Sequence, residues 1–307
     1  MNSVPAFDWE HFQGRYELHA HSTASDGRLS PGDLVKAAAA AELKLLALTD
    51  HDTIGGIAEA REAAQAHEMT LLPGVELSTS WNQHSTHLLG YFPPEWKLNA
   101  PAALDFAQWL EHTRDLRRQR NRLIGEKMRA QGIPINVEEL AEERRKHGGQ
   151  LLGRPHLAHW LVSHGHAISI SDAFARFLTP GTPTYVRLEG VPTGDAIARI
   201  HQAGGLASLA HPSRLQFEWR SNLPELAAAG LDGLEVFYPQ HDARLVQELG
   251  ELARLHHLLP TGGSDFHGRA EDKLGAIPLA PELLRAWPKH WRSSPEPMGS
   301  GRAKLKH

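Results

Sequence analysis

Short apolar runs and helical periodicities alternate along the first third of the chain. The apolar runs predict strands at residues 16–20, 45–49, 71–76 and 87–92. Helical periodicity separates the first three of them, over residues 31–42 and 54–67. Ser30, Pro31 and Asp33 predict where the first of these helices starts, because serine caps a helix and proline suits its first turn. Strands that alternate with helices predict β/α units around a parallel sheet.

The pattern changes after Pro93-Pro94. Residues 98–185 are almost entirely helical in character, and their long charged stretch at 103–131 ends at Gly132. Alternation then resumes, with predicted helices at 193–202, 223–229 and 242–256 and predicted strands at 206–210, 233–237 and 258–259. We therefore predict one α/β barrel, interrupted by a helical insertion. The expected boundaries are 14–97 and 186–287 for the barrel, 98–185 for the insertion, and 288–307 for a flexible tail.

Composition fits a globular protein and excludes several classes. Hydrophobic residues make up 41% of the 307 residues and charged residues 22%. No apolar run approaches the roughly 18 residues of a membrane span, and the N-terminus resembles no secretory signal, so we expect a cytoplasmic protein. Cysteine is absent, which excludes thiolate ligands and nucleophiles. The net charge of −4 argues against double-stranded DNA as a partner, and any contact with a polyanion needs a local basic patch.

Histidine is unusually frequent, with 21 residues, and its placement is informative. His19 and His21 end the first predicted strand and point to one face, because alternate residues of a strand share a face. Other histidines and carboxylates also end or follow predicted strands, except for His87, which begins one: Asp26, His51, Glu76, His87, His211, Asp265 and His267. In a β/α barrel these ends form one rim, where such enzymes carry their active sites. A single residue of this kind would usually be an ordinary loop residue, but nine on one rim predict a metal centre.

The chemistry of these nine residues limits the choice of metal. Six imidazoles, two aspartates and one glutamate exceed the four to six ligands of a typical single ion, so we expect two or three ions with Glu76 as a bridge. Mixed imidazole and carboxylate ligands suit Mn²⁺, which we favour, or Zn²⁺ or Fe²⁺. Closely spaced divalent ions activate water and stabilise the displacement at a phosphoryl group.

The motifs around these residues resemble the PHP (polymerase and histidinol phosphatase) family. The matching segments are ELHAHS at 17–22 with SDG at 25–27, TDHD at 49–52, GVE at 74–76, HLLGY at 87–91, AHP at 210–212 and GSDFHG at 263–268. They follow the family order across residues 16–268. The helical insertion resembles the bacterial branch that contains 3′,5′-nucleoside bisphosphate phosphatases and 5′-to-3′ exoribonucleases.

The resemblance implies a distorted (β/α)7 barrel with three metal ions. The first ion would take His19, His21, Glu76 and Asp265; the second would share Glu76 and add His87 and His211; the third would take Asp26, His51 and His267. His84 competes with His87, which fits the family pattern His-x-x-Gly better.

The resemblance also points to basic residues that would bind substrate phosphates. Arg114, Arg117 and Arg118 share one face of the long predicted helix, and the family branch places phosphate-binding residues there. The alternative is a solvated helix face balanced by acidic neighbours. Arg154 and His156 match the branch's Arg-x-His segment at a helix start, where free N–H groups favour an anion. A salt bridge at the helix end is the other explanation for Arg154.

Together these features predict a metal-dependent phosphohydrolase that removes the 3′-phosphate from 3′,5′-nucleoside bisphosphates. A hydroxide between the first two ions would attack phosphorus, with Asp265 as ligand and proton acceptor. His211, His267 or solvent would protonate the leaving group. The alternatives are a 5′-to-3′ exoribonuclease acting on short or 5′-phosphorylated RNA, a non-catalytic metal-binding domain, and histidinol phosphatase, which the arginine-rich insertion disfavours. The sequence predicts no oligomeric state.

Overall fold

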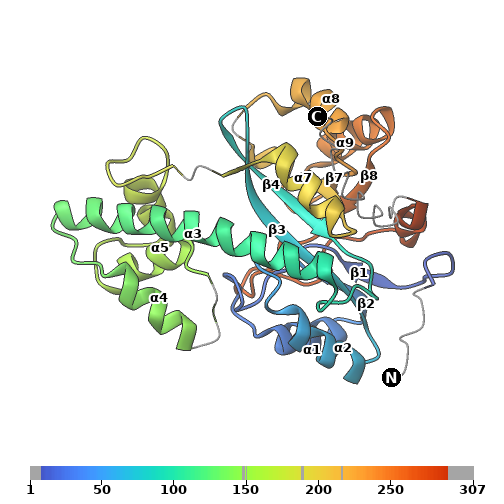
Figure 1. Cartoon of the computed structure of the whole chain (residues 1–307), viewed down its shortest axis with the longest axis horizontal. Helices are drawn as coiled ribbons and strands as arrows, with labels where there is room; N and C mark the ends of the chain where they lie inside the picture. The colour runs from blue at the N-terminus through green and yellow to red at the C-terminus, as the bar shows by residue number, and fades with distance from the viewer. Residues whose placement is uncertain (1–7, 147–148, 150, 188–189, 216, 290–307) are drawn as a thin grey trace, which may run out of the picture.

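One mixed sheet curls into a distorted barrel (Figure 1). The computed structural model describes residues 8–146, 149, 151–187, 190–215 and 217–289. Within these residues the strand order is β1-β2-β3-β4-β6-β7-β8, with β5 beside β3. The bounds are β1 Arg15–Glu17, β2 Leu43–Leu48, β3 Thr70–Trp81, β4 His84–Tyr91, β5 Val191–Pro192, β6 Leu206–Leu209, β7 Gly233–Phe237 and β8 Leu259–Gly262. Just beyond β1 and β8, a parallel bridge between Ala20 and Phe266 joins the two ends of the sheet.

The expectation of a purely parallel sheet is wrong at β4. This strand pairs antiparallel with both β3 and β6, whereas β1-β2, β2-β3, β6-β7 and β7-β8 are parallel. The physical reason is the short connection at Asn82 and Gln83, whose φ angles are +46° and +66°. Two consecutive residues with positive φ form the hairpin turn that matches strand twist, so the chain reverses directly without a crossover helix.

In the described part of the chain, five helices cover the barrel, close to their predicted positions. They are α1 Pro31–Ala40, α2 Ile57–Ala66, α7 Thr193–Gln202, α8 Trp219–Ala228 and α9 Ala243–Leu255. Ser30 caps α1 as expected, since its side chain accepts a hydrogen bond from the Asp33 amide. Short 3₁₀ helices at Pro212–Arg214 and Pro281–Lys289 complete this part. The second reaches into the predicted tail, of which residues 290–307 lie outside the described chain.

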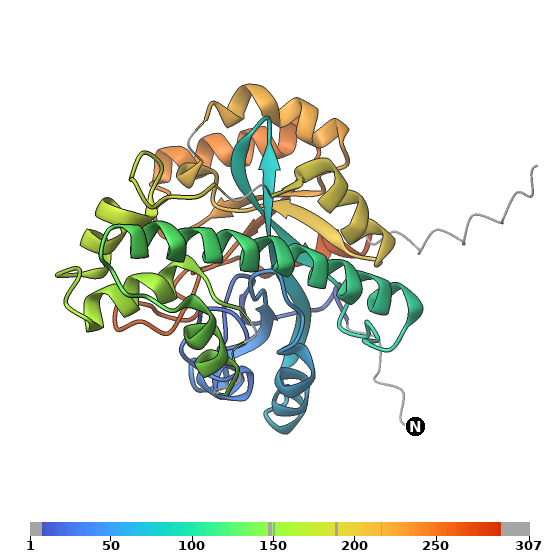
Figure 2. The same cartoon turned by 60° about the vertical axis from the view of Figure 1, so that its left-hand side comes forward.

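The segment between β4 and β5 is helical, and its helices are α3 Pro101–Ala130, α4 Val137–Lys146, α5 Arg154–Ser163, α6 Ile170–Ala173 and the π-helical turn Phe174–Leu178. Figure 2 shows the long green α3 crossing the molecule from the barrel to this group. Phe106 and Leu110 of α3 pack in a barrel cluster, while Ile124 and Met128 pack in a separate cluster with α5. The helix therefore anchors the insertion to the barrel at one end and its own core at the other. No helix in the described part of the chain is both long and apolar enough to cross a membrane.

Candidate metal centre

The predicted ligands converge at the carboxyl ends of the parallel strands. His19 and His21 follow β1, His51 follows β2, His211 follows β6, and Asp265 and His267 follow β8. Glu76 lies within β3, and His87 pairs opposite Ser78 in the first half of β4. Because β4 runs antiparallel, its early residues reach the same rim as the ends of its neighbours. The antiparallel strand β4 thus contributes His87 to the rim at which the neighbouring parallel strands end.

Glu76 lies at the middle of the centre and presents its two oxygens to different partners. Its Oε2 lies 3.4 Å from His19 Nε2 and 3.2 Å from His21 Nε2. Its Oε1 lies 2.8 Å from His87 Nδ1 and 2.9 Å from His211 Nε2. A carboxylate held this way can bridge two ions, one on each oxygen.

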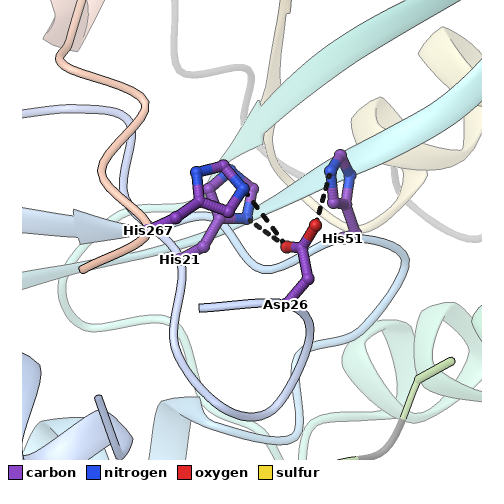
Figure 3. A group of neighbouring side chains, drawn as sticks. All are labelled: His21, Asp26, His51 and His267. Atoms are coloured by element: carbon purple, nitrogen blue, oxygen red, sulfur yellow. Dashed lines mark ion pairs between the residues drawn. The ribbon is translucent and has the colours of Figure 1, made fainter. Parts of the chain in front are cut away.

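Three overlapping groups of side chains place a ligand atom from each member within 4.8 Å of the others. Their members are His19, His21, Glu76 and Asp265 in the first, His51, Glu76 and His87 in the second, and His21, Asp26, His51 and His267 in the third. His21 and His51 each belong to two groups, because their two ring nitrogens face different ways. In the third group Asp26 lies between the three imidazoles, with Oδ1 3.3 Å from His267 Nε2 (Figure 3).

This arrangement differs in three details from the partition that the resemblance implies. His21, expected only at the first ion, also belongs to the third group, with Nδ1 3.8 Å from Asp26 Oδ1. His51, expected only at the third ion, also contacts Glu76 Oε2 at 3.2 Å. His211 joins no group of three, but its contact with Glu76 Oε1 places it beside His87. His84, the competitor of His87, lies apart and stacks on Phe217, with ring centroids 5.0 Å apart.

The donor set fits divalent ions. Three buried ring nitrogens in these groups, His19 Nε2, His21 Nε2 and His51 Nδ1, have no hydrogen-bond partner among the described residues. A buried polar atom without a partner is costly unless a ligand satisfies it. Imidazole nitrogen mixed with carboxylate oxygen suits Mn²⁺, Zn²⁺ or Fe²⁺.

Electrostatics keep the carboxylates ready to bind cations. Burial would raise the pKa values of Asp26, Glu76 and Asp265, but the surrounding imidazoles hold all three well below the usual range. Burial also opposes protonation of His21, yet its ion pairs with Asp265 and Glu76, each at 3.2 Å, raise its pKa to about 10. For His51 burial dominates and lowers the pKa to about 3. A cation that binds here therefore competes with a proton on His21.

Carboxylates behind the centre, which the sequence reasoning missed, hold the ligands in place. Glu235 of β7 lies 2.9 Å from His19 Nδ1 and accepts a hydrogen bond of 2.6 Å from the His211 amide. Glu17 accepts from the amides of His19 and Ser264, at 3.1 and 2.9 Å. Such outer partners fix the orientation of metal-binding rings. An acidic residue inside a buried apolar strand was the available signal for Glu235.

Asp265 is held from its far side by two further residues absent from the predictions. Tyr238 Oη donates to Asp265 Oδ2 at 2.8 Å, and Arg214 Nη1 donates to the same oxygen at 3.2 Å. Asp265 Oδ1 is left facing His21 Nε2 at 3.2 Å. The backbone of Asp265 has a φ of +53°, and that of His211 has a φ of +29°. Such strained residues concentrate at functional sites.

The three arginines predicted to share one helix face have different surroundings. Arg117 is buried and forms an ion pair with the Asp52 carboxylate and a hydrogen bond to Ser78 Oγ. Arg114 binds Glu111 and the Asp52 carbonyl oxygen. The half-exposed Arg118 pairs with two acidic residues of its own helix, as the solvated-face alternative expects.

Arg154 and His156 lie in the first turn of α5. Arg154 Nη1 donates to the Leu178 carbonyl at 3.2 Å. His156 Nδ1 accepts from the Gly153 amide at 2.9 Å, and burial together with Arg144 lowers its pKa to about 4. Neither residue forms an ion pair of 4.0 Å or less with a carboxylate in the described chain.

Arg120 is a further basic residue that the sequence reasoning left aside. It is only 6% exposed, and its guanidinium donates to the Asn121 side chain but to no carboxylate in the described chain. Burial and the charges of Arg117 and Arg154 lower its pKa. Arg117 pairs with Asp52, whereas Arg120 and Arg154 pair with no carboxylate in the described chain and lie close enough to Arg117 for the charges to act on one another, so the three form a cationic cluster.

A barrel rim that gathers three overlapping histidine and carboxylate groups defines a metal-dependent protein. Comparison with known proteins supplies the family. The sequence model of the PHP domain family matches residues 17–132 of this chain. The 5′-3′ exoribonuclease Rnm of Escherichia coli is 38% identical over 257 residues, which cover 82% of this chain and 85% of that protein. A 3′,5′-nucleoside bisphosphate phosphatase of Chromobacterium violaceum is 36% identical over 83% of this chain and 88% of its own.

A solved structure agrees with these relatives. An amidohydrolase from Chromobacterium violaceum superimposes with a TM-score of 0.77 at 34% identity, over 90% of this chain and 95% of the other. The chain belongs to the PHP family. The expected family and the PHP-type barrel fold are therefore confirmed.

Proposed function

We propose that this protein is a metal-dependent phosphohydrolase that removes the 3′-phosphate from 3′,5′-nucleoside bisphosphates. The observation that carries the proposal is Glu76, whose two oxygens face separate sets of imidazoles. A carboxylate that bridges two sets of imidazole ligands can hold two closely spaced ions, which two-metal phosphoester hydrolysis uses. The relatives named as a bisphosphate phosphatase and as an exoribonuclease support the same reaction class.

The residues that would hold the ions are those that the resemblance implies, and the three groups contain all of them except His211. His19, His21, Glu76 and Asp265 would hold the first ion; Glu76, His87 and His211 the second; Asp26, His51 and His267 the third. Mn²⁺ is the proposed ion, with Zn²⁺ and Fe²⁺ as alternatives. Bound divalent ions would polarise the phosphoryl oxygens and lower the pKa of attacking water.

The protein's own residues would then position and move protons. Asp265 is ionised at neutral pH and is the proposed acceptor of the proton from the attacking water. Tyr238 and Arg214 fix its outer oxygen, which keeps the inner oxygen toward the centre. The leaving alkoxide would take its proton from His211, His267 or solvent.

Recognition of the second phosphate is assigned to the insertion. Arg154, with Arg117 and Arg120 beside it, offers more positive charge than Asp52 can balance. An anionic phosphate would neutralise the remaining positive charge, and guanidinium groups bind phosphate through bidentate hydrogen bonds. The charge of Asp26, a member of the third group, acts on His156. We therefore expect His156 to lie between this phosphate and the metal groups. The contacts of Arg118 favour a role on the helix surface instead.

The second candidate is 5′-to-3′ exoribonuclease activity at the same centre, because the Escherichia coli relative carries that name. Both reactions break a phosphoester bond beside another phosphate. A metal-binding domain without catalysis is the distant alternative.

Hydrolysis assays in Mn²⁺ would separate these candidates. The substrates are a 3′,5′-nucleoside bisphosphate, a short 5′-phosphorylated RNA and histidinol phosphate. Inorganic phosphate and nucleoside 5′-phosphate from the bisphosphate are the expected products. Faster release of mononucleotides from RNA would make the exoribonuclease the principal activity. Absence of turnover on all three substrates with metal bound would overturn the proposal.

A further inference from the structure

Two arginines flank the third group of metal-binding side chains on its outer side. Arg28 follows Asp26 by two positions, and Arg269 follows His267 by two positions. The Arg28 amide donates to the His267 carbonyl at 2.9 Å, which joins the two loops. Both arginine side chains are exposed. Their positions place two cations at the edge of the centre.

The insertion closes over the same edge. Arg144, near the end of α4, donates from Nη2 to the carbonyl oxygens of Ser25 and Thr23, at 2.7 and 3.3 Å. His159 is exposed on α5, one turn after His156, and it lies close enough to Arg28 and Arg269 for their charges to act on it. These contacts bring α4 and α5 against the two loops.

The charge of this surface is not neutralised locally. Within the described residues, Arg28, Arg144 and Arg269 form no ion pair with a carboxylate at 4.0 Å or less. Asp272 lies in the last loop, and its Oδ2 accepts from the amides of His267 and Arg269, at 2.8 and 3.0 Å. Arg118, Arg145 and Arg220, by contrast, all pair with acidic neighbours.

We propose that Arg28, His159 and Arg269 form an outer basic surface that binds the phosphates of a single-stranded RNA leading out of the metal centre. The inference rests on the proposed phosphohydrolase site and adds to the RNA candidate a surface that would hold the strand outside the centre. Guanidinium groups bind backbone phosphates, and an exposed imidazole ring can stack on an unpaired base. A mononucleotide has its two phosphates at the centre and at the Arg154 cluster, so it leaves no phosphate for this surface. Arg144 positions the insertion against the loops.

The test compares a double variant with a control of equal charge. Arg28→Gln combined with Arg269→Gln removes two cations from the surface. Arg244→Gln combined with Arg254→Gln removes two exposed cations from α9. Binding of a fluorescent, 5′-phosphorylated RNA hexamer is measured by anisotropy in chelator, across a series of salt concentrations. This readout is independent of turnover.

The surface variant should bind the hexamer about tenfold more weakly at 0.1 M salt, since two exposed ionic contacts are lost. Its slope of log Kd against log salt should be flatter by about 1.4, or 0.7 for each lost phosphate contact. The α9 control should match the unmodified protein. In Mn²⁺, the loss of kcat/KM should be larger on the hexamer than on the bisphosphate.

Three outcomes decide the matter. Equal affinity and slope in the surface variant and the α9 control would overturn the inference, as would unmeasurable binding of RNA by the unmodified protein. Equal losses on hexamer and bisphosphate would place these arginines at the centre instead and would also overturn it. Failure of the proposed function is a separate result: no hydrolysis of any substrate in Mn²⁺, whatever the binding data show.

Discussion

The buried ion pair between Arg117 and Asp52 connects the insertion to the metal centre, and its removal is the sharpest test of the structure. Asp52 follows His51 directly and has a φ of +48°. Its Oδ1 accepts from the Ser78 amide at 2.8 Å, and its Oδ2 binds Arg117. Replacement of Arg117 by glutamine would leave this carboxylate buried without its cation.

The expected loss follows from burial. Asp52 is 1% exposed and Arg117 is 7% exposed, so solvent cannot replace the lost partner. Removal of one member of a buried pair typically costs about 3–5 kcal/mol. This is a large part of the roughly 5–15 kcal/mol that stabilises a folded domain. Arg118→Gln on the same helix is the control, because exposed pairs contribute only about 0–1 kcal/mol.

Urea unfolding in chelator, monitored by circular dichroism, measures the free energy of unfolding of Arg117→Gln and of the control Arg118→Gln. Arg117→Gln should lower the midpoint strongly, and a second change, Asp52→Asn, should recover part of the loss because it removes the stranded charge. Metal content should also fall, since the loop carries His51. A loss under about 1 kcal/mol, equal to that of Arg118→Gln, would show that the pair is not buried as described. Because loss of Arg117 should destabilise the fold, simultaneous replacement of Arg114, Arg117 and Arg118 cannot test phosphate binding alone.

Three further predictions concern the ligands, the substrate and pH. Glu76→Gln should lower metal content and abolish turnover, because a neutral amide cannot balance two dications. His256→Ala, just beyond the end of α9, should change neither. Full metal occupancy with normal rates in Glu76→Gln would refute the bridge. Arg154→Ala should lower kcat/KM roughly 10- to 150-fold on a bisphosphate, from a contact of about 1.5–3 kcal/mol, and far less on a monophosphate; equal losses would place it at the scissile phosphate. Between about pH 6.5 and 4, unfolded chains protonate His156 while the folded protein does not, so stability should fall with falling pH by up to about 1.4 kcal/mol per pH unit. His156→Gln should flatten this slope in urea titrations, with exposed His112→Gln as control; an unchanged slope would mean that His156 titrates normally.

The sequence alone determined most of the elements and the residue types of the candidate centre. Helix α7 has the predicted bounds Thr193–Gln202, and Ser30 caps α1. These features depend on periodicity and capping, which act between residues close in the chain. The nine ligand-type residues could be selected for the same reason. All but His87 end or follow predicted strands, and strand ends meet on one rim of a barrel.

The tertiary structure decided how distant residues pair. It reversed β4, so that His87 reaches the rim from an antiparallel strand. It turned the two oxygens of Glu76 toward separate partners and placed His51 in two groups. Strand direction depends on turn geometry and on the partner strand, neither of which hydrophobic periodicity records.

The arginines show the same limit most clearly. On a helix drawn from the sequence, Arg117 and Arg118 are equivalent basic residues. In the folded protein Arg117 is buried against Asp52, while Arg118 remains half-exposed with acidic neighbours on its own helix. The difference arises because one side of the helix packs on the barrel. Arg117 lies on that side and meets the buried Asp52 carboxylate, whereas Arg118 faces solvent. Helical spacing identified the charges, and long-range packing determined what each charge does.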